Sequence, residues 1–127
     1  MPGLTLPDSD SEPDYSNLWI AAGEGNLSLV QHYLSHGGPN DSSLDPNAKD
    51  EFQYTCLHAA VSYSHIHVVE YLLDQGADVN ISDGDGDTPL HVVENVDIAR
   101  LLIDKGADPT LVNDSGMMVR ILLKSHV

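Results

Sequence analysis

The sequence predicts an all-α solenoid, in which helix-turn-helix pairs stack side by side and loops resembling β-hairpins join one pair to the next. Two motifs carry this prediction because they recur in the same order. TCLH at 55–58 returns as TPLH at 88–91, 33 residues later, and GAD at 76–78 returns at 106–108. Recurrence at a period of about 20 to 50 residues indicates a repeat array, whose units bury their apolar sides against one another.

The segment from Thr55 to Asn80 shows how one unit is built. Thr55 stands where a helix N-cap is needed, because its hydroxyl can accept a hydrogen bond from a free N–H of the first turn. Gly76 ends the second helix, because glycine adopts the left-handed C-terminal conformation without steric cost. Helical spacing predicts burial of Leu57, Ala60 and Val61 in the first helix, and of Ile66, Val69, Leu72 and Leu73 in the second.

The 127 residues are expected to form a tail, three repeats and a cap. Residues 1–14 are rich in proline and acidic residues, which predicts a disordered acidic tail. Ser9 and Ser11 in it are each followed three positions on by an acid, so we expect either kinase sites or a plain acidic tail. The expected units are repeat one at 15–47, with helices at 17–24 and 27–35 and an inserted loop at 38–44, repeat two at 48–80, repeat three at 81–110 and a partial cap at 111–127.

Repeat three is the shortened unit, because His91 to Gly106 is three residues shorter than His58 to Gly76. Its first helix is therefore expected to lose its last turn, so that Glu94-Asn95 carries the reversal. The second helix is expected to resume with Val96, Ala99, Leu102 and Ile103.

The last segment predicts a hairpin tip followed by a final helix. The tip is expected at Asn113–Gly116 and the helix at Met117–Ser125. Its apolar side, with Val119, Leu122 and Leu123, is expected to cover repeat three, because the end of a repeat array needs a cap.

The period of 33 residues, with TPLH and GADVN in phase, resembles the ankyrin repeat from about Ser16 to the C-terminus. The HVVEN segment at 91–95 is similar to that of small fungal ankyrin proteins. Trp19 and Gln53 depart from the pattern, because the family has histidine and glycine there, and Gln53 leaves the tip geometry open. The resemblance implies an intracellular, non-enzymatic adaptor, inhibitor or dedicated chaperone that binds another protein through hairpin tips and inner helices.

Carried over by position, the resemblance implies a partner-binding ridge along the repeats. Its members are Lys49, Glu51, Phe52, Tyr54, Ser62, Tyr63, Ser82, Asp85, Asp87, Asp114 and Met117. Phe52 has two readings. It is a binding anchor, or it folds back over the gap left by Gln53.

Acidic residues dominate the composition, with 20 Asp and Glu against 5 Lys and Arg and a net charge of −15. Such a field repels phosphate backbones, which argues against nucleic acid as a partner. It favours a basic protein partner, or serves solubility alone. The N-terminus has no signal-like run and no segment suits a membrane span, so we expect a monomer in the cytoplasm, with the nucleus as a second location.

A calcium or metal site is the alternative function. Asp83, Asp85 and Asp87, with Glu94 eleven residues after Asp83, match the acidic positions of an EF-hand loop, but Thr88 stands where that loop needs glycine. The other reading is an acidic hairpin with glycines at its turn. His32 and His36 have metal-ligand spacing without an evident third ligand. No motif of a catalytic or cofactor site is present, so we expect no enzyme activity, no cofactor and no resident metal.

Two further residues have a structural and a chemical reading. Cys56, the only cysteine, is expected to be structural. Asn80 follows Leu72 by eight residues, a pattern that in ankyrin proteins suits asparaginyl hydroxylation. The alternative is that its side chain only bonds backbone in the turn.

Overall fold

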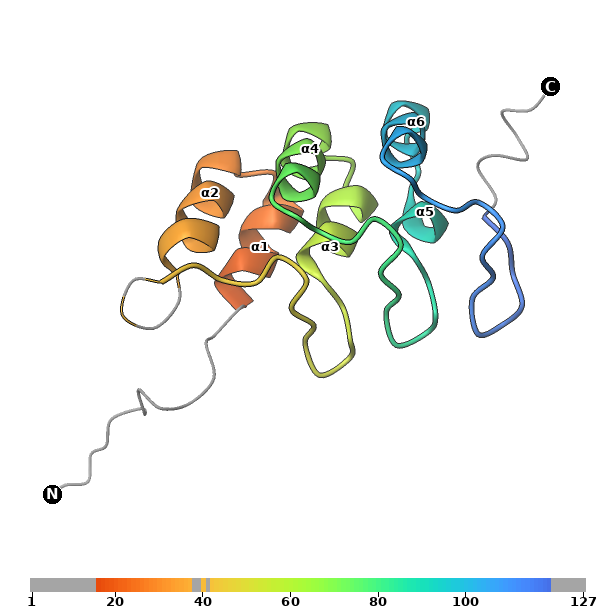
Figure 1. Cartoon of the computed structure of the whole chain (residues 1–127), viewed down its shortest axis with the longest axis horizontal. Helices are drawn as coiled ribbons and strands as arrows, with labels where there is room; N and C mark the ends of the chain where they lie inside the picture. The colour runs from red at the N-terminus through yellow and green to blue at the C-terminus, as the bar shows by residue number, and fades with distance from the viewer. Residues whose placement is uncertain (1–15, 38–39, 41, 120–127) are drawn as a thin grey trace, which may run out of the picture.

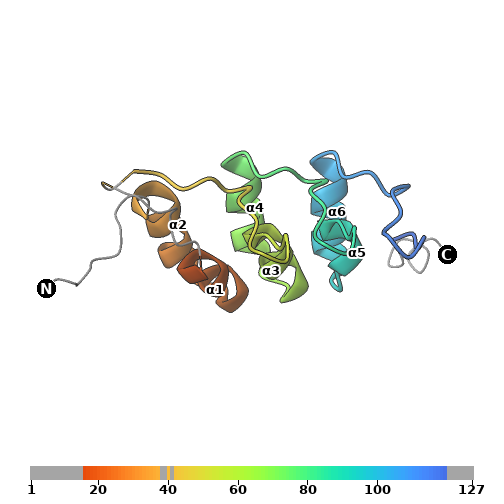
Figure 2. The same ribbon diagram turned by 90° about the horizontal axis from the view of Figure 1, so that it is seen from below.

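The computed structural model describes residues 16–37, 40 and 42–119, and within these ranges it is helical without strands. The helices form three pairs, stacked in a row with α1, α3 and α5 in one layer and α2, α4 and α6 in the other (Figures 1 and 2). The all-α solenoid predicted from the sequence is confirmed. The bounds are α1 Ser16–Glu24, α2 Leu27–His36, α3 Cys56–Ser62, α4 Ile66–Asp74, α5 Pro89–Val92 and α6 Val96–Asp104.

Three hairpin loops project on one side of the helices and lie side by side (Figure 1). We call them the first hairpin, residues 50–54, the second, residues 83–87, and the third, residues 113–117. In each hairpin the N–H of the first residue donates to the carbonyl oxygen of the last, at an N–O distance of 3.0 Å. The loops are thus closed turns of one design, as expected for units that repeat.

The helix ends form where the sequence places them. Thr55 has an extended backbone, and its hydroxyl accepts a hydrogen bond from the His58 N–H at 3.2 Å, which confirms the predicted N-cap. Gly76 and Gly106 both follow the last turn of a helix with positive φ, 99° and 102°. The chain therefore leaves α4 and α6 by the same left-handed exit.

The buried residues of α4 and α6, the second helices of repeats two and three, differ in part from those predicted for α4. In α4, Val68, Val69 and Leu72 are buried, and in α6 the equivalent Ile98, Ala99 and Leu102 are buried. Val69 and Leu72 confirm the predicted burial in α4. Burial of Ile66 and Leu73 was overestimated, since both are only partly buried. Val96 and Ile103, at the matching positions of α6, are 41% and 36% exposed.

The shortened first helix of repeat three is confirmed. α5 has 4 residues, whereas α3 has 7. Val93 then turns extended with ψ 141°, and the Asn95 side chain caps α6 by accepting from the Asp97 and Ile98 N–H groups at 2.8 and 3.1 Å. The missing three residues are thus taken from the last turn of α5, and the reversal lies at Glu94 and Asn95.

The prediction for the C-terminal cap is right about its hairpin and wrong about the start of its helix. Residues 117–119 are not helical, because Met117 closes the third hairpin and its carbonyl accepts from the Asn113 N–H. Val119 is 2% exposed, so it covers repeat three as predicted. The predicted tail at 1–14, residues 38, 39 and 41 of the inserted loop, and residues 120–127 with Leu122 and Leu123 lie outside the described residues.

Replacing Leu72 by alanine should cost about 2–5 kcal/mol of unfolding free energy, because its side chain is fully buried and its removal leaves a cavity. Urea denaturation followed by circular dichroism measures this loss. Ile103→Ala is the matched control on the neighbouring outer helix, and should cost about 1 kcal/mol or less because its side chain is partly exposed. Equal losses in the two variants would show that the assigned helix faces are wrong.

Candidate partner-binding site

Each hairpin is held by the side chain of its first residue. Asp50 Oδ1 accepts from the N–H groups of Phe52 and Tyr54, both at 2.8 Å. Asp83 and Asn113 make the same pair of bonds in the second and third hairpins, at 2.9 to 3.0 Å. Sequence reasoning missed this role of Asp50 and Asp83. The available signal was an Asp or Asn at one fixed position of every repeat, a residue type that bonds backbone two residues on.

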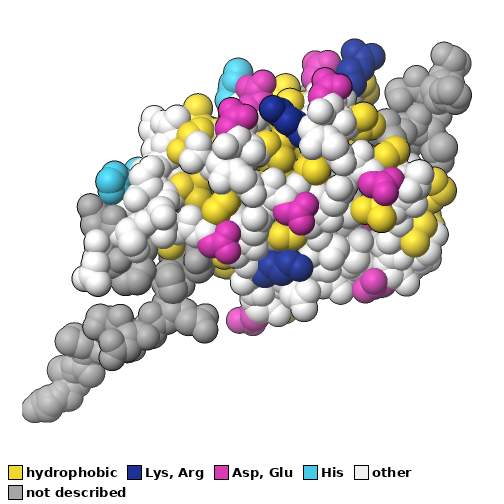
Figure 3. Space-filling model, viewed as in Figure 1, with side chains coloured by type: hydrophobic (Ala, Val, Ile, Leu, Met, Phe, Trp, Pro, Cys, Tyr) yellow, Lys and Arg dark blue, Asp and Glu magenta, His cyan; other side chains and the backbone are white. Residues whose placement is uncertain are grey.

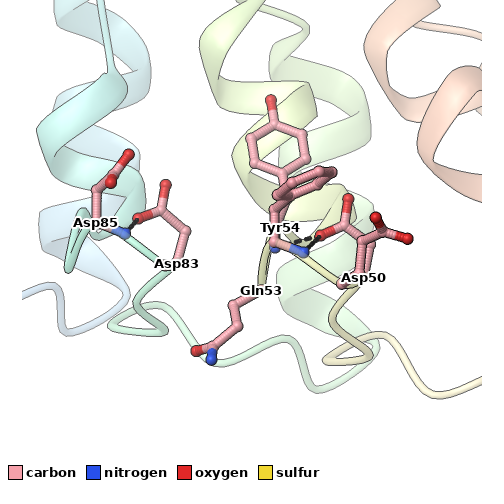
Figure 4. A pocket seen from close by; sticks show the side chains of 8 residues that line it. Asp50, Gln53, Tyr54, Asp83 and Asp85 are labelled. Atoms are coloured by element: carbon pink, nitrogen blue, oxygen red, sulfur yellow. Dashed lines mark hydrogen bonds between the residues drawn. The ribbon is translucent and has the colours of Figure 1, made fainter.

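The first hairpin keeps the usual tip geometry although Gln53 stands where the family has glycine. The φ of Gln53 is 63°, close to the 78° of Gly86 and the 75° of Gly116 at the equivalent positions. Gln53 therefore adopts the left-handed region, which costs a residue with a Cβ roughly 1–2 kcal/mol. Its side chain points away from the helices (Figure 4).

Hydrogen bonds also join each tip to the next. The Gly84 N–H donates to the Phe52 carbonyl oxygen at 3.1 Å, and the Asp114 N–H donates to the Asp85 carbonyl oxygen at 3.0 Å. Glycine is required at 84, because a Cβ there would lie 2.7 Å from the Phe52 oxygen. The three tips thus form one connected row.

His58 of α3 and His91 of α5 fix the position of the second and third hairpins relative to the helices. His58 Nε2 lies 2.7 Å from the Asp87 carbonyl oxygen, and His58 Nδ1 lies 2.8 Å from Thr55 Oγ1. Because a carbonyl only accepts, Nε2 carries the proton and Nδ1 accepts from the threonine hydroxyl. His91 repeats the bridge to the Met117 carbonyl oxygen at 3.0 Å. Both histidines therefore have a structural role that reaches across the repeat boundary.

Asparagines form a second line of bridges on the side of the outer helices. Asn80 Nδ2 donates to the Gly106 carbonyl oxygen at 3.2 Å, and Asn80 Oδ1 accepts from the Asp108 N–H at 2.8 Å. Asn47 bonds Gly76 and Asp78 in the same way. The Asn80 side chain therefore bonds backbone, as its structural reading predicted, although the backbone belongs to the next repeat.

A shallow pocket of about 630 Å³ lies between the first and second hairpins (Figure 4). Its lining residues are Asp50, Glu51, Phe52, Gln53, Tyr54, Asp83, Gly84 and Asp85. The Phe52 side chain is 71% exposed, so the reading in which it folds back over Gln53 is wrong. The pocket thus combines an exposed aromatic side chain with carboxylates from two hairpins.

Two tyrosines belong to the predicted ridge, Tyr54 in the pocket lining and Tyr63 at the end of α3. The half-buried Tyr54 ring stacks on the His58 ring, with centroids 5.6 Å apart. Burial raises the pKa of Tyr54, and the negative charges of Tyr63, Asp83 and Asp50 raise it further. Tyr63 is 65% exposed at the end of α3. Its ring lies against Gly23 of repeat one, where an added Cβ would be 3.5 Å away.

The structure brings the other predicted ridge residues to the same row of tips or beside it. Asp87 and Ser62 are half-buried, and the Asp87 carboxylate accepts from Asn113 Nδ2 at 2.8 Å. The exposed members are Lys49, Glu51, Ser82, Asp85, Asp114 and Met117.

The acidic group of the second hairpin has a structural explanation. Carboxylate oxygens of Asp83, Asp85 and Asp87 lie within 4.8 Å of one another, and Asp83 Oδ1 is already bonded to two backbone N–H groups. Asn113 Oδ1 accepts the same two backbone hydrogen bonds in the third hairpin, and its amide is neutral. The rings of His32 and His36 have centroids 5.8 Å apart, and no third histidine, cysteine or carboxylate of the described ranges joins them in a ligand cluster.

Cys56 is a buried part of the core. Burial raises the pKa of its thiol to about 12, and the thiol donates to the Pro46 carbonyl oxygen at 3.5 Å. A thiol with so high a pKa is a poor nucleophile near neutral pH.

Comparison with known families decides the identity of the fold. The model for ankyrin repeats in three copies matches residues 18–113. The chain belongs to the ankyrin-repeat family. Ankyrin repeats are general protein-protein interaction modules. None of the helices within the described ranges is long and apolar enough to cross a membrane.

Similar ankyrin-repeat chains occur in proteins of very different length. Over 87% of its length the chain is 41% identical to ankyrin repeat-containing protein P1E11.10 of Schizosaccharomyces pombe, and covers 51% of that protein. It is 41% identical over 65% of its length to human BCL-6 corepressor-like protein 1, and 42% over 58% to the potassium channel AKT1 of Arabidopsis thaliana. It covers 5% and 8% of those two proteins.

Replacing Gln53 by glycine should raise the unfolding free energy by up to about 1 kcal/mol, because glycine removes the left-handed strain but loses more backbone entropy. Gln75→Gly is the matched control, since the φ of Gln75 is −89° and only the entropy loss applies. Thermal and urea melts should therefore shift in opposite directions for the two variants. A destabilised Gln53→Gly protein would contradict the strain assigned to the tip.

Stability should fall as the pH drops below about 6.5, and His58 should account for part of the fall. Burial lowers the pKa of His58 from its ordinary value of 6.5, against the opposing effects of the Asp87 carbonyl and nearby carboxylates. The folded chain therefore binds fewer protons at this site than the unfolded chain, so the contribution of neutral His58 is full above that value and lost below it. Urea melts from pH 7.5 to 5 should show a flatter decline for His58→Gln. The exposed His67→Gln should behave like the parent, and equal slopes in all three would contradict the assignment.

Calcium should leave the protein unchanged, because Asp83 is engaged with the backbone and Thr88 begins a helix turn rather than the rest of a binding loop. Calorimetric titration should give no binding heat and the melting temperature should not move. A binding heat at micromolar calcium that disappears in Asp85→Asn would overturn this.

Proposed function

We propose that this chain is a non-enzymatic module that binds a basic protein through a ridge made of the three hairpin tips and the exposed end of α3. The carrying observation is that backbone bonds join the tips into one row, with Phe52 exposed on the first tip and Tyr63 exposed at the end of α3. A surface held in this way loses little conformational freedom on binding, which favours affinity. Adaptor, inhibitor and dedicated chaperone are all roles that such one-to-one binding serves.

The charge of the ridge supports a basic partner. Asp50, Glu51, Asp83, Asp85, Asp87 and Asp114 all lie in the three hairpins, and Lys49 alone among the ridge residues is basic. Lys and Arg are also sparse among the acidic and apolar side chains on the face seen in Figure 3. A field of one sign attracts an oppositely charged protein and speeds the encounter, at the cost of strong salt dependence.

Apolar contact at the centre of the ridge supplies the remaining affinity in this proposal. Large apolar or aromatic side chains that are exposed together in one patch mark binding sites, whereas single exposed ones are common. Phe52 is 71% exposed, Tyr63 is 65% exposed, and Tyr54 lies between the stacked His58 ring and the pocket. An aromatic centre surrounded by charged groups is the common composition of a binding hot spot.

The same proposal assigns the chain no catalytic role, and places it as a monomer in the cytoplasm or the nucleus. The absence of a catalytic role is inferred from the family and from the composition of the ridge. Asp50 and Asp83 hold hairpin backbone, and Asp87 accepts from Asn113 Nδ2 of the next hairpin. The other ridge carboxylates are exposed to solvent, where they serve as charges for recognition.

Replacing Phe52 by alanine should weaken partner binding by roughly 2 kcal/mol or more and leave the melting temperature nearly unchanged, because the side chain is exposed. Affinity purification from cells that express the protein, followed by mass spectrometry, identifies proteins held by the parent chain. The partner should be basic, should be held by Ile103→Ala, and should be lost on Phe52→Ala and at high salt. A partner that Phe52→Ala retains at parental affinity would contradict the ridge at its centre.

A further inference from the structure

The pocket between the first two hairpins has walls of two chemical kinds. Phe52 and Tyr54 come from the first hairpin, and Asp83 and Asp85 come from the second (Figure 4). Asp50 and Glu51 of the first hairpin also line it, so a ligand group in this pocket touches an aromatic surface and carboxylates from both hairpins. Few side chains suit both surfaces at once.

The carboxylates divide into those that build the hairpins and those that remain for a ligand. Asp50 and Asp83 each accept two backbone N–H groups through Oδ1. Glu51 and Asp85 are exposed members of the pocket lining, and within the described part of the chain their side chains take no part in the hairpin bonds. They can therefore turn toward a cation without loosening the tips.

The two walls are fixed relative to one another. The Gly84 N–H donates to the Phe52 carbonyl oxygen at 3.1 Å, and His58 holds the end of the second hairpin through the Asp87 carbonyl. Gly84 itself adds no side chain to the space in front of Phe52. The pocket is thus present before a partner arrives, which reduces the entropy lost on binding.

We propose that this pocket binds an arginine side chain of the partner protein, with its guanidinium plane against Phe52 and its N–H groups directed to Glu51 and Asp85. The inference rests on the proposed function and names the side chain that the ridge recognises. Both walls contribute, because a guanidinium stacks on aromatic faces and donates along its edges.

Lysine meets these demands less well than arginine. Its ammonium is a compact, strongly hydrated charge that cannot lie flat on a ring and donate along two edges at once. Exposed ion pairs contribute little by themselves, so the aromatic contact decides the preference. The pocket should therefore discriminate between two side chains of equal charge.

The test is an NMR titration of the full-length, ¹⁵N-labelled chain with three synthetic Gly/Ser-rich peptides that differ only in a central arginine, lysine or citrulline. Citrulline keeps the shape of arginine and removes its charge. The arginine peptide should shift amide signals at 50–54 and 83–85, and should bind roughly threefold or more tightly than the lysine peptide. Phe52→Ala and Asp85→Asn should each abolish this preference. Asp97→Asn, at an exposed position of α6, should retain it, and melting curves verify that the variants are folded.

Equal binding of the arginine and lysine peptides, binding of citrulline as strong as that of arginine, shifts outside the two hairpins, or no binding at millimolar peptide would each overturn the proposal. Its failure is separate from failure of the proposed function. If Phe52→Ala loses the native partner but the peptides show no arginine preference, the ridge stands and the arginine pocket does not. If the preference is found but Phe52→Ala keeps the native partner, the pocket stands without the ridge.

Discussion

The hydrogen bond from His58 Nε2 to the Asp87 carbonyl oxygen is the contact on which the arrangement of the binding surface depends. It joins a buried side chain of one repeat to the end of the next repeat's hairpin at 2.7 Å, while Thr55 fixes the ring from the other side. Repeat arrays contact only their neighbours, so such a bridge is how the position of one unit sets that of the next. Because His91 repeats it in the next unit, the three tips stand in one row.

The fold could be predicted from the sequence because its determinants are local and repeated. Thr55 marks a helix start by its side-chain hydroxyl, and Gly76 marks a helix end by its backbone freedom. The three residues missing after His91 could only come from the helix or the reversal that follow. The errors arose where contacts with a neighbouring repeat decide which residues are buried or helical. Val68 and Ile98 are buried by packing that one helix's periodicity does not specify. The Met117 carbonyl is engaged by the Asn113 N–H and by His91, so Met117 does not begin a helix, although its side chain suits one.

The candidate site was predictable in position but not in chemistry. The family pattern placed Phe52, Tyr54 and Asp85 on the tips, and the structure brings them to one pocket. Asp50 and Asp83 act through hydrogen bonds to backbone N–H groups that exist only in the closed hairpin. From composition alone they counted only as two more negative charges. Gln53 adopts the left-handed backbone that glycine has in the other tips, so the first hairpin has the usual shape and leaves no gap. Phe52 therefore has no gap to cover, and its side chain is exposed.

Native-state hydrogen exchange, measured by NMR on the parent chain and on His58→Phe, tests most directly whether the histidine bridge orders the tips. Amides of the second hairpin, above all Gly84 and Asp87, should lose protection in the variant by much more than those of the first hairpin. Local opening of this kind has its own free energy, separate from global unfolding. If the second hairpin kept its protection, or if every amide lost protection equally, the bridge would not be what holds the row of tips in place.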